Sequence, residues 1–135
     1  MNKNLKKKTD NEEARQHRIP CKSVNGFFKH WFRFLKPLHK LTDREIDVIS
    51  SFATQRYELS KVIQDTDILD KYTMNSDTKK KVREECNISL QNFQVIMSNL
   101  RKHGVIIDNK INPRYVPNLD GEAKTFQLML HFEIE

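Results

Sequence analysis

Only fragments of metal-binding or catalytic motifs occur in this sequence. His17 and Cys21 are spaced i, i+4 like metal ligands, but no second pair follows them, as a zinc site requires. Asp65, Asp67 and Asp70 resemble part of a calcium loop, without its central glycine and closing glutamate. We find no convincing nucleophile beside a base and no glycine-rich phosphate loop. We therefore expect a protein that is not an enzyme and that holds no metal and no cofactor.

The charged side chains are unevenly distributed along the chain. Its 135 residues include 24 Lys+Arg and 18 Asp+Glu, a net charge of +6. Residues 1–40 contain 11 Lys+Arg and 3 Asp+Glu, a net of +8, whereas residues 41–135 contain 13 and 15, a net of −2. A basic stretch of this kind suits nucleic acid or another polyanion. Outside it, phosphate binding would depend mainly on Lys79, Lys80 and Lys81.

Residues 1–26 are predicted to form a basic, extended arm. They are polar and without hydrophobic periodicity, and they include Lys6, Lys7 and Lys8 as candidate nucleic-acid-binding residues. The opening residues lack the apolar core of a secretory signal, and no run approaches the roughly 18 apolar residues of a membrane span. We expect a protein that is neither secreted nor in a membrane.

Residues 27–40 are predicted to form an aromatic-rich helix or linker that ends at Pro37. Six large apolar side chains occupy the nine positions from residue 27 to residue 35, more than one face of a short helix can bury. Some should pack on the domain and the others on a partner protein, because exposed aromatic patches usually mark interfaces. The candidate interface residues are Phe27, Phe28, Trp31, Phe32 and Phe34. Basic residues interleaved with the aromatics leave stacking on bases as the alternative interpretation.

Residues 41–135 are predicted to form a single domain that begins with two helices. Thr42 and Glu45 have the spacing of a capping box, and Leu41 can close on Ile46 as a hydrophobic staple, so a helix begins here. A second helical face is predicted from Leu59 toward Tyr72.

Two further helices are predicted on either side of a three-residue turn. Ser76 and Asp77 open the first of them, and the turn is Asn87-Ile88-Ser89. Ser89 caps the last helix, which ends at Gly104. Its predicted inward positions are Phe93, Ile96 or Met97, and Leu100. The whole chain should therefore contain four to five helices.

Strand patterns follow Gly104. Val105–Ile107 is a predicted short strand, Asp108–Lys110 a hairpin turn and Ile111–Val116 the return strand. Strict alternation from Phe126 to Ile134 predicts a half-buried C-terminal strand. The fold class is therefore α+β, mainly α.

The order of these elements resembles a winged helix-turn-helix domain. The resemblance is carried by residues 78–117, TKKKVREECNISLQNFQVIMSNLRKHGVIIDNKINPRYVP. It implies that the helix after the turn reads the major groove and that the hairpin is the wing. By position, it implies base contacts from Gln91, Asn92 and Gln94, and phosphate contacts from Arg101, Lys102 and Lys110. However, the first three turns of this helix contain no Arg or Lys, so the common bidentate contact to guanine is missing.

Residues 34–117 are also similar to small proteins encoded near the capsid genes of crAss-like tailed bacteriophages. The similarity lies in the opening LTDREIDVIS and the close QNFQVIMSNLRKHGVIIDNKINPRYVP. It implies a virion protein, a class that commonly threads basic arms over neighbouring subunits or toward packaged DNA.

Two functions remain open from the sequence. The first is a phage virion or assembly component, oligomeric in context, whose domain packs on partner subunits and whose arm extends over partners or double-stranded DNA. Such a protein would be found in the virion or in the host cytoplasm. The alternative is a winged helix-turn-helix transcriptional regulator that binds DNA. The charge split and the excess of aromatic residues favour the first, because both lie outside the helix-turn-helix.

Overall fold

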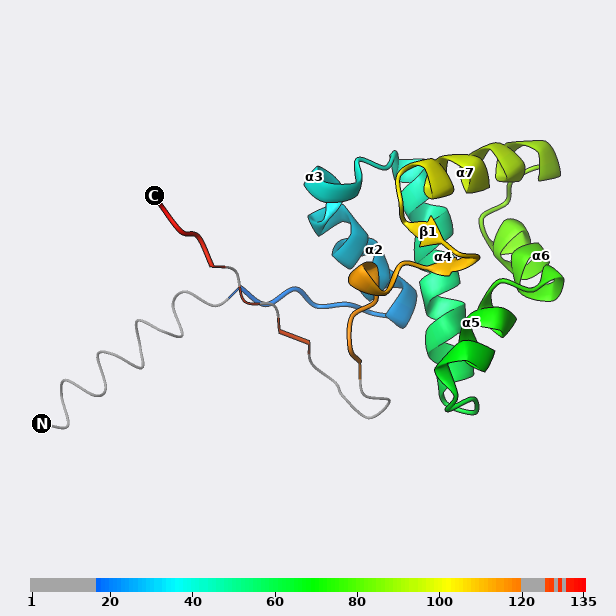
Figure 1. The fold of residues 1–135 in the computed structure, drawn as a ribbon, viewed down its shortest axis with the longest axis horizontal. Helices are drawn as coiled ribbons and strands as arrows, with labels where there is room; N and C mark the ends of the chain where they lie inside the picture. Colours follow the sequence, from blue (N-terminus) through cyan, green and yellow to red (C-terminus); the bar gives the residue numbers. More distant parts are fainter. Residues whose placement is uncertain (1–16, 120–125, 128, 130) are drawn as a thin grey trace, which may run out of the picture.

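A computed structural model of the protein describes residues 17–119, 126–127, 129 and 131–135. These residues contain six α-helices, one two-stranded antiparallel sheet and one 3-10 helix (Figure 1). The helices are α2 (Val24–Phe34), α3 (Lys36–His39), α4 (Asp43–Ser60), α5 (Thr66–Thr73), α6 (Ser76–Glu85) and α7 (Leu90–Lys102). The strands are β1 (Ile106–Ile107) and β2 (Lys110–Ile111), and the 3-10 helix is Pro113–Tyr115. The expectation of a mainly helical α+β fold is confirmed, although the helices exceed the predicted four to five.

Helix α2 begins three residues inside the predicted arm. Ser23 caps it by accepting a hydrogen bond from the backbone N–H of Gly26 at 3.0 Å. The aromatic-rich stretch is interrupted at Leu35, before Pro37, because Pro37 lies in the first turn of α3, where its missing N–H costs nothing. Residues 27–40 therefore form two helices, and Lys40 ends the second in the left-handed region (φ 58°).

The predicted capping box at the start of α4 is confirmed. The backbone N–H of Glu45 donates to the Thr42 hydroxyl at 3.3 Å, and the carboxylate of Glu45 accepts from the N–H of Thr42 at 2.9 Å. Leu41 and Ile46, the predicted staple pair, are both buried. Helix α4 then runs through the middle of the domain, with α2, α5, α6 and α7 packed around it (Figure 1).

The predicted second helix is displaced. Leu59 belongs to the last turn of α4, and Val62 is exposed in the loop that follows. Helix α5 begins only where Asp65 can accept from the backbone N–H of Ile68 at 3.1 Å. The cap outweighs the apolar spacing here, because it satisfies a backbone donor that the start of every helix leaves unpaired.

The segment from α6 to α7 is close to its prediction. Helix α6 is capped by Asn75, and α7 is capped by Ser89 through the backbone N–H of Asn92 at 3.2 Å. Asn87, between them, has the positive φ of 51° that reverses the chain. All four predicted inward side chains of α7 are buried: Phe93, Ile96, Met97 and Leu100. Gly104 (φ 72°) ends the segment, as expected.

The hairpin lies where it is predicted but is shorter. Asp108 and Asn109 both have positive φ, which is the two-residue turn that the right-handed twist of a hairpin prefers. The return strand ends at Ile111 and does not reach Val116. The amide side chain of Asn112 accounts for this, because its oxygen accepts from the N–H of Arg114 at 3.1 Å and starts a 3-10 turn.

The predicted strand from Phe126 to Ile134 is absent at the positions that the structure describes. Phe126 itself packs edge-on against Phe27 and Trp31, with ring centroids 5.5 and 5.3 Å apart. Beyond it, Phe132 and Ile134 are exposed. A strand needs a neighbour to pair its backbone groups, and within the described residues neither two-residue strand of the hairpin supplies one.

His39 connects α2, α3 and the start of α4 inside the core. The backbone N–H of Leu41 donates to its Nδ1 at 3.0 Å, so its proton is on Nε2, which donates to the carbonyl of Phe32 at 2.6 Å. Burial is the main cause that lowers the pKa of His39 below 6.5, and nearby His103 and Lys36 lower it further. The neutral imidazole is therefore part of the native packing.

No helix of the described residues is long and apolar enough to cross a bilayer.

Candidate binding surface

The outer face of α7 combines exposed amides with exposed aliphatic side chains. Gln91, Asn92 and Gln94 are exposed, while Leu90 and Val95 expose 56% and 57% of their surface. The four buried residues of α7 fix this face, because side chains three and four positions apart share one side of a helix. The exposed face is uncharged until Arg101 in the last turn.

Contacts from α4 hold the turn before α7 in place. The guanidinium of Arg44 donates to the backbone carbonyls of Cys86 and Asn87, which lie beyond the C-terminal end of α6. Ser51 donates to the carboxylate of Glu85 at 2.9 Å. Burial raises the pKa of the Cys86 thiol, which therefore stays protonated and unreactive at neutral pH. The start of α7 is thus fixed by side chains of another helix.

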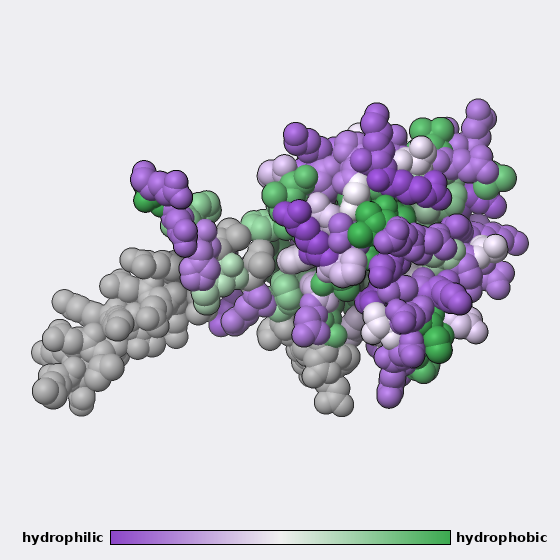
Figure 2. All heavy atoms as spheres, in the orientation of Figure 1, coloured by the Kyte–Doolittle hydropathy of each residue, from purple (hydrophilic) through white to green (hydrophobic). Residues whose placement is uncertain are grey.

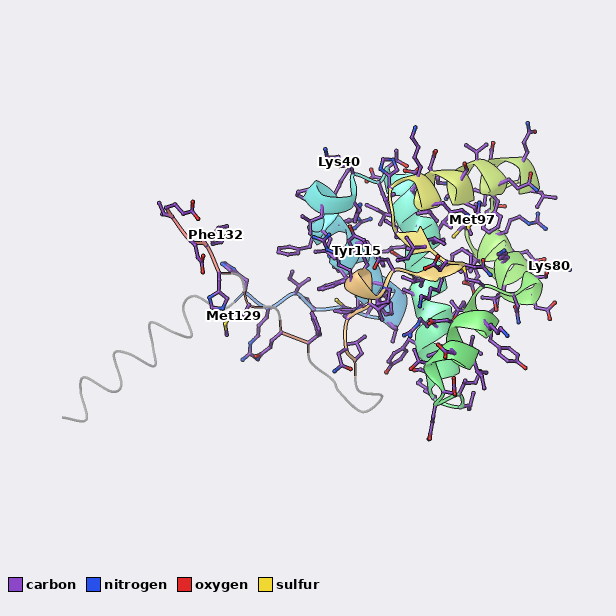
Figure 3. The ribbon with its side chains drawn as sticks, in the orientation of Figure 1. Lys40, Lys80, Met97, Tyr115, Met129 and Phe132 are labelled. Carbon is purple, nitrogen blue, oxygen red and sulfur yellow. The ribbon has the colours of Figure 1, made fainter. Side chains whose placement is uncertain are left out.

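The predicted phosphate-binding cations come from three elements: α6, the last turn of α7 and β2. Lys79, Lys80 and Lys81 lie in the middle of α6, and Figure 3 shows Lys80 on the outer side of that helix. Arg101 and Lys102 lie at the C-terminal end of α7. Lys110, on β2, is half-buried.

The ion pairs of the described residues nevertheless involve none of these six cations. These cations remain available to a partner, and they are divided among α6, α7 and β2. Predicted Lys6, Lys7 and Lys8 lie outside the described residues.

Of the five predicted interface residues, two belong to the core and the other three keep exposed surface. Phe28 and Phe32 are buried in the core of the domain, because they lie one turn apart on the side of α2 that packs on α4. Phe27 is half-buried against that core. Trp31 is also half-buried, and its Nε1–H donates to the backbone carbonyl of Tyr115 at 2.9 Å. Phe34, exposed by 51%, is the most exposed of the five.

A basic and apolar surface on α2 and α3 combines Phe34, from the predicted interface, with three residues that were not among the predicted sites. We call it the α2–α3 surface, and its exposed residues are Arg33, Phe34, Leu38 and Lys40. Residues 17–40 contain six Lys+Arg and no Asp or Glu. This charge count was available in the sequence, but it did not reveal which side chains would face outward.

A half-open groove of about 380 Å³ lies between α4, α5 and the residues after β2. The ion pair of Arg56 with Asp70, at 3.1 Å, lies in its wall and ties α5 to α4. Within the described residues, no group of three or more His, Cys, Asp or Glu side chains is placed to hold a metal ion. The groove therefore has a clear structural ion pair and no assembled metal site.

The exposed hydrophobic residues of the helical part form only small patches on its visible face (Figure 2). Figure 2 shows hydrophilic residues over most of the visible face of the helical part, with hydrophobic residues in small separate patches. The α7 face and the α2–α3 surface both have exposed apolar side chains beside polar ones in an ordered helix, as does α5 with Ile68 and Tyr72.

Comparison with known proteins supplies no relative: no protein-family model matches the chain, and neither a curated protein nor a solved structure matches it.

Proposed function

We propose that the protein is a non-catalytic subunit of a larger assembly and that α7 packs on a partner subunit. The exposed, uncharged face of α7 carries this proposal. Leu90 and Val95 lie among amide side chains, and the central parts of protein interfaces are depleted in charge.

A winged-helix arrangement of α4, α6, α7 and the β1–β2 hairpin is part of this proposal. Winged helices serve protein binding as well as DNA binding, so the fold does not decide between them. The proposed assembly is a virion, as the resemblance of residues 34–117 to small proteins of crAss-like phages implies, with the basic N-terminal residues extending over partners or DNA.

The test is incorporation of tagged protein into particles in the native context, measured by quantitative mass spectrometry. Val95→Asp places a charge in the centre of the α7 face, and we expect about a tenfold loss of incorporation. Ile68→Asp is the matched control, because Ile68 is similarly exposed but lies on α5. Equal incorporation of Val95→Asp and wild type would contradict the proposal.

DNA binding by α7 is the second candidate. Exposed Asn92 and Gln94 can pair with adenine, and the six cations named above are free of ion pairs within the described residues. In this case Asn92→Ala should relax sequence preference on a labelled duplex, and Lys80→Ala should reduce the salt dependence of binding. Recovery of duplex DNA alone from the native context would favour this candidate over the first.

A further inference from the structure

The described residues near the C-terminal end, 126–127, 129 and 131–135, include exposed apolar side chains, and Phe126 is packed on the domain. Phe126 is fixed against Phe27 and Trp31. Phe132 and Ile134 are exposed by 87% and 97%, and Figure 3 shows Phe132 on a chain that extends away from the helices. Large apolar side chains that stay in water forgo the free energy of burial, which favours a surface that covers them.

The charge of this segment is as distinctive as its hydrophobicity. Glu133 and Glu135 lie next to the exposed Phe132 and Ile134, and residues 126–135 contain no Lys or Arg. The surface that covers the segment should therefore be apolar with cations at its edge.

The α2–α3 surface has this composition. Phe34 and Leu38 are exposed by 51% and 56% at the junction of the two helices. Arg33 and Lys40 are exposed beside them in the sequence and take part in none of the ion pairs of the described residues. Apolar and charged groups on the two surfaces are thus complementary.

We propose that residues 126–135 of one copy dock on the α2–α3 surface of a second copy. Phe132 and Ile134 cover Phe34 and Leu38. An extended chain is only about 5 Å wide, so long cationic side chains at its edges can reach the carboxylates on its outer side. In this arrangement Arg33 and Lys40 pair with Glu133 and Glu135.

Both surfaces remain exposed within one copy of the chain, which is why we assign the contact to a second copy. The contact is head-to-tail, since each copy offers a segment on one side and a receiving surface on the other. Such contacts close into rings or continue into filaments. The inference deepens the proposed function by naming one partner, and it rests on the role as an assembly subunit.

The experiment is sedimentation of the purified full chain over a concentration series, without any other component. We expect the mass to rise with concentration above that of one chain. Phe132→Asp with Ile134→Asp should weaken association at least tenfold, and so should Phe34→Asp with Leu38→Asp. Met129→Asp is the matched control, because Met129 is equally exposed but on the opposite side of the alternating pattern. Circular dichroism checks that each variant is folded.

Mixing the two double variants gives the sharpest result. Each alone should be a monomer, whereas the mixture should form a dimer and nothing larger, because only one segment and one receiving surface remain intact. A wild-type chain that stays monomeric at all concentrations would overturn the inference, as would a mixture that does not dimerise. Val95→Asp should associate like wild type, so a failure of this contact is separate from a failure of the α7 proposal.

Discussion

The α7 face and the α2–α3 surface differ in how far local interactions build them. Helix α7 has its own N-cap, four buried residues in register and a glycine that ends its segment, so its exposed face follows from residues close in sequence. The α2–α3 surface depends on packing against α4 and on residues that lie far along the chain, such as Tyr115 and Phe126. The spacing of residues in the sequence therefore predicts the α7 face better than it predicts the α2–α3 surface.

The largest expected effect tests whether the aromatic residues of α2 are core. Phe32→Ala should lower the free energy of unfolding by about 3–5 kcal/mol, because Phe32 is completely buried. Phe34→Ala, on the same helix, should lower it by only about 0.5 kcal/mol. Urea denaturation followed by circular dichroism measures both. Similar losses from the two variants would mean that α2 does not pack as described.

The end of the α7 segment should be the next most sensitive position. Gly104 has a φ of 72° with no heavy atom within 4 Å of an added Cβ, so Gly104→Ala introduces backbone strain without a clash. We expect a loss of about 1–2 kcal/mol in unfolding free energy. Gly104→Asn should lose less, because asparagine tolerates the left-handed region. Equal losses would indicate that backbone conformation is not the cause.

Removal of the α7 cap should have a smaller effect. Ser89→Ala deletes the acceptor for the backbone N–H of Asn92 and should cost about 1 kcal/mol of unfolding free energy. Ser98→Ala removes an equally exposed hydroxyl from the same helix and should change it by less than about 0.5 kcal/mol. Thermal unfolding of the two variants separates the cap from general helix propensity.

Acidification should weaken the junction of α3 and α4, and the loss of stability should be smallest near neutral pH. The pKa of His39 is lowered in the folded protein, so below about pH 6.5 the unfolded chain binds a proton more readily than the native one. Stability should fall from there until the pH has passed the lowered pKa. The hydrogen bond with Phe32 and the charge of Glu45 oppose this lowering of the His39 pKa.

The measurement is the melting temperature between pH 8 and pH 5. His39→Gln should make the melting temperature decline less as the pH falls, and it should also lower the stability at neutral pH. His103→Gln should retain the decline of the melting temperature. A wild-type melting temperature that does not change across this range would show that His39 titrates normally.

Local hydrogen bonds explain which elements the sequence predicts. The capping box of Thr42 and Glu45, the cap at Ser89 and the end at Gly104 each involve residues within six positions of one another. These signals can be identified from spacing alone, and the structure contains all of them.

Two of the errors concern elements that depend on distant residues. Alternation from Phe126 to Ile134 is necessary for a half-buried strand but not sufficient, because pairing requires a neighbour that the described residues do not provide. The density of aromatic residues in α2 indicated an interface because the sequence does not show that α4, Tyr115 and Phe126 would cover most of them. At the α7 face, exposure was predictable from periodicity, but the identity of the partner is not a property of one helix.

The hydrogen bond from Trp31 to the Tyr115 carbonyl closes a loop of 84 residues. Trp31 is also the one tryptophan of the sequence. Its fluorescence therefore reports on the long-range contacts of α2 with the end of the hairpin region and with Phe126. Because contacts between distant residues form late when loop closure is costly, the emission should change after the helices have formed. A spectroscopic signal for the last step of folding is thus built into the native sequence.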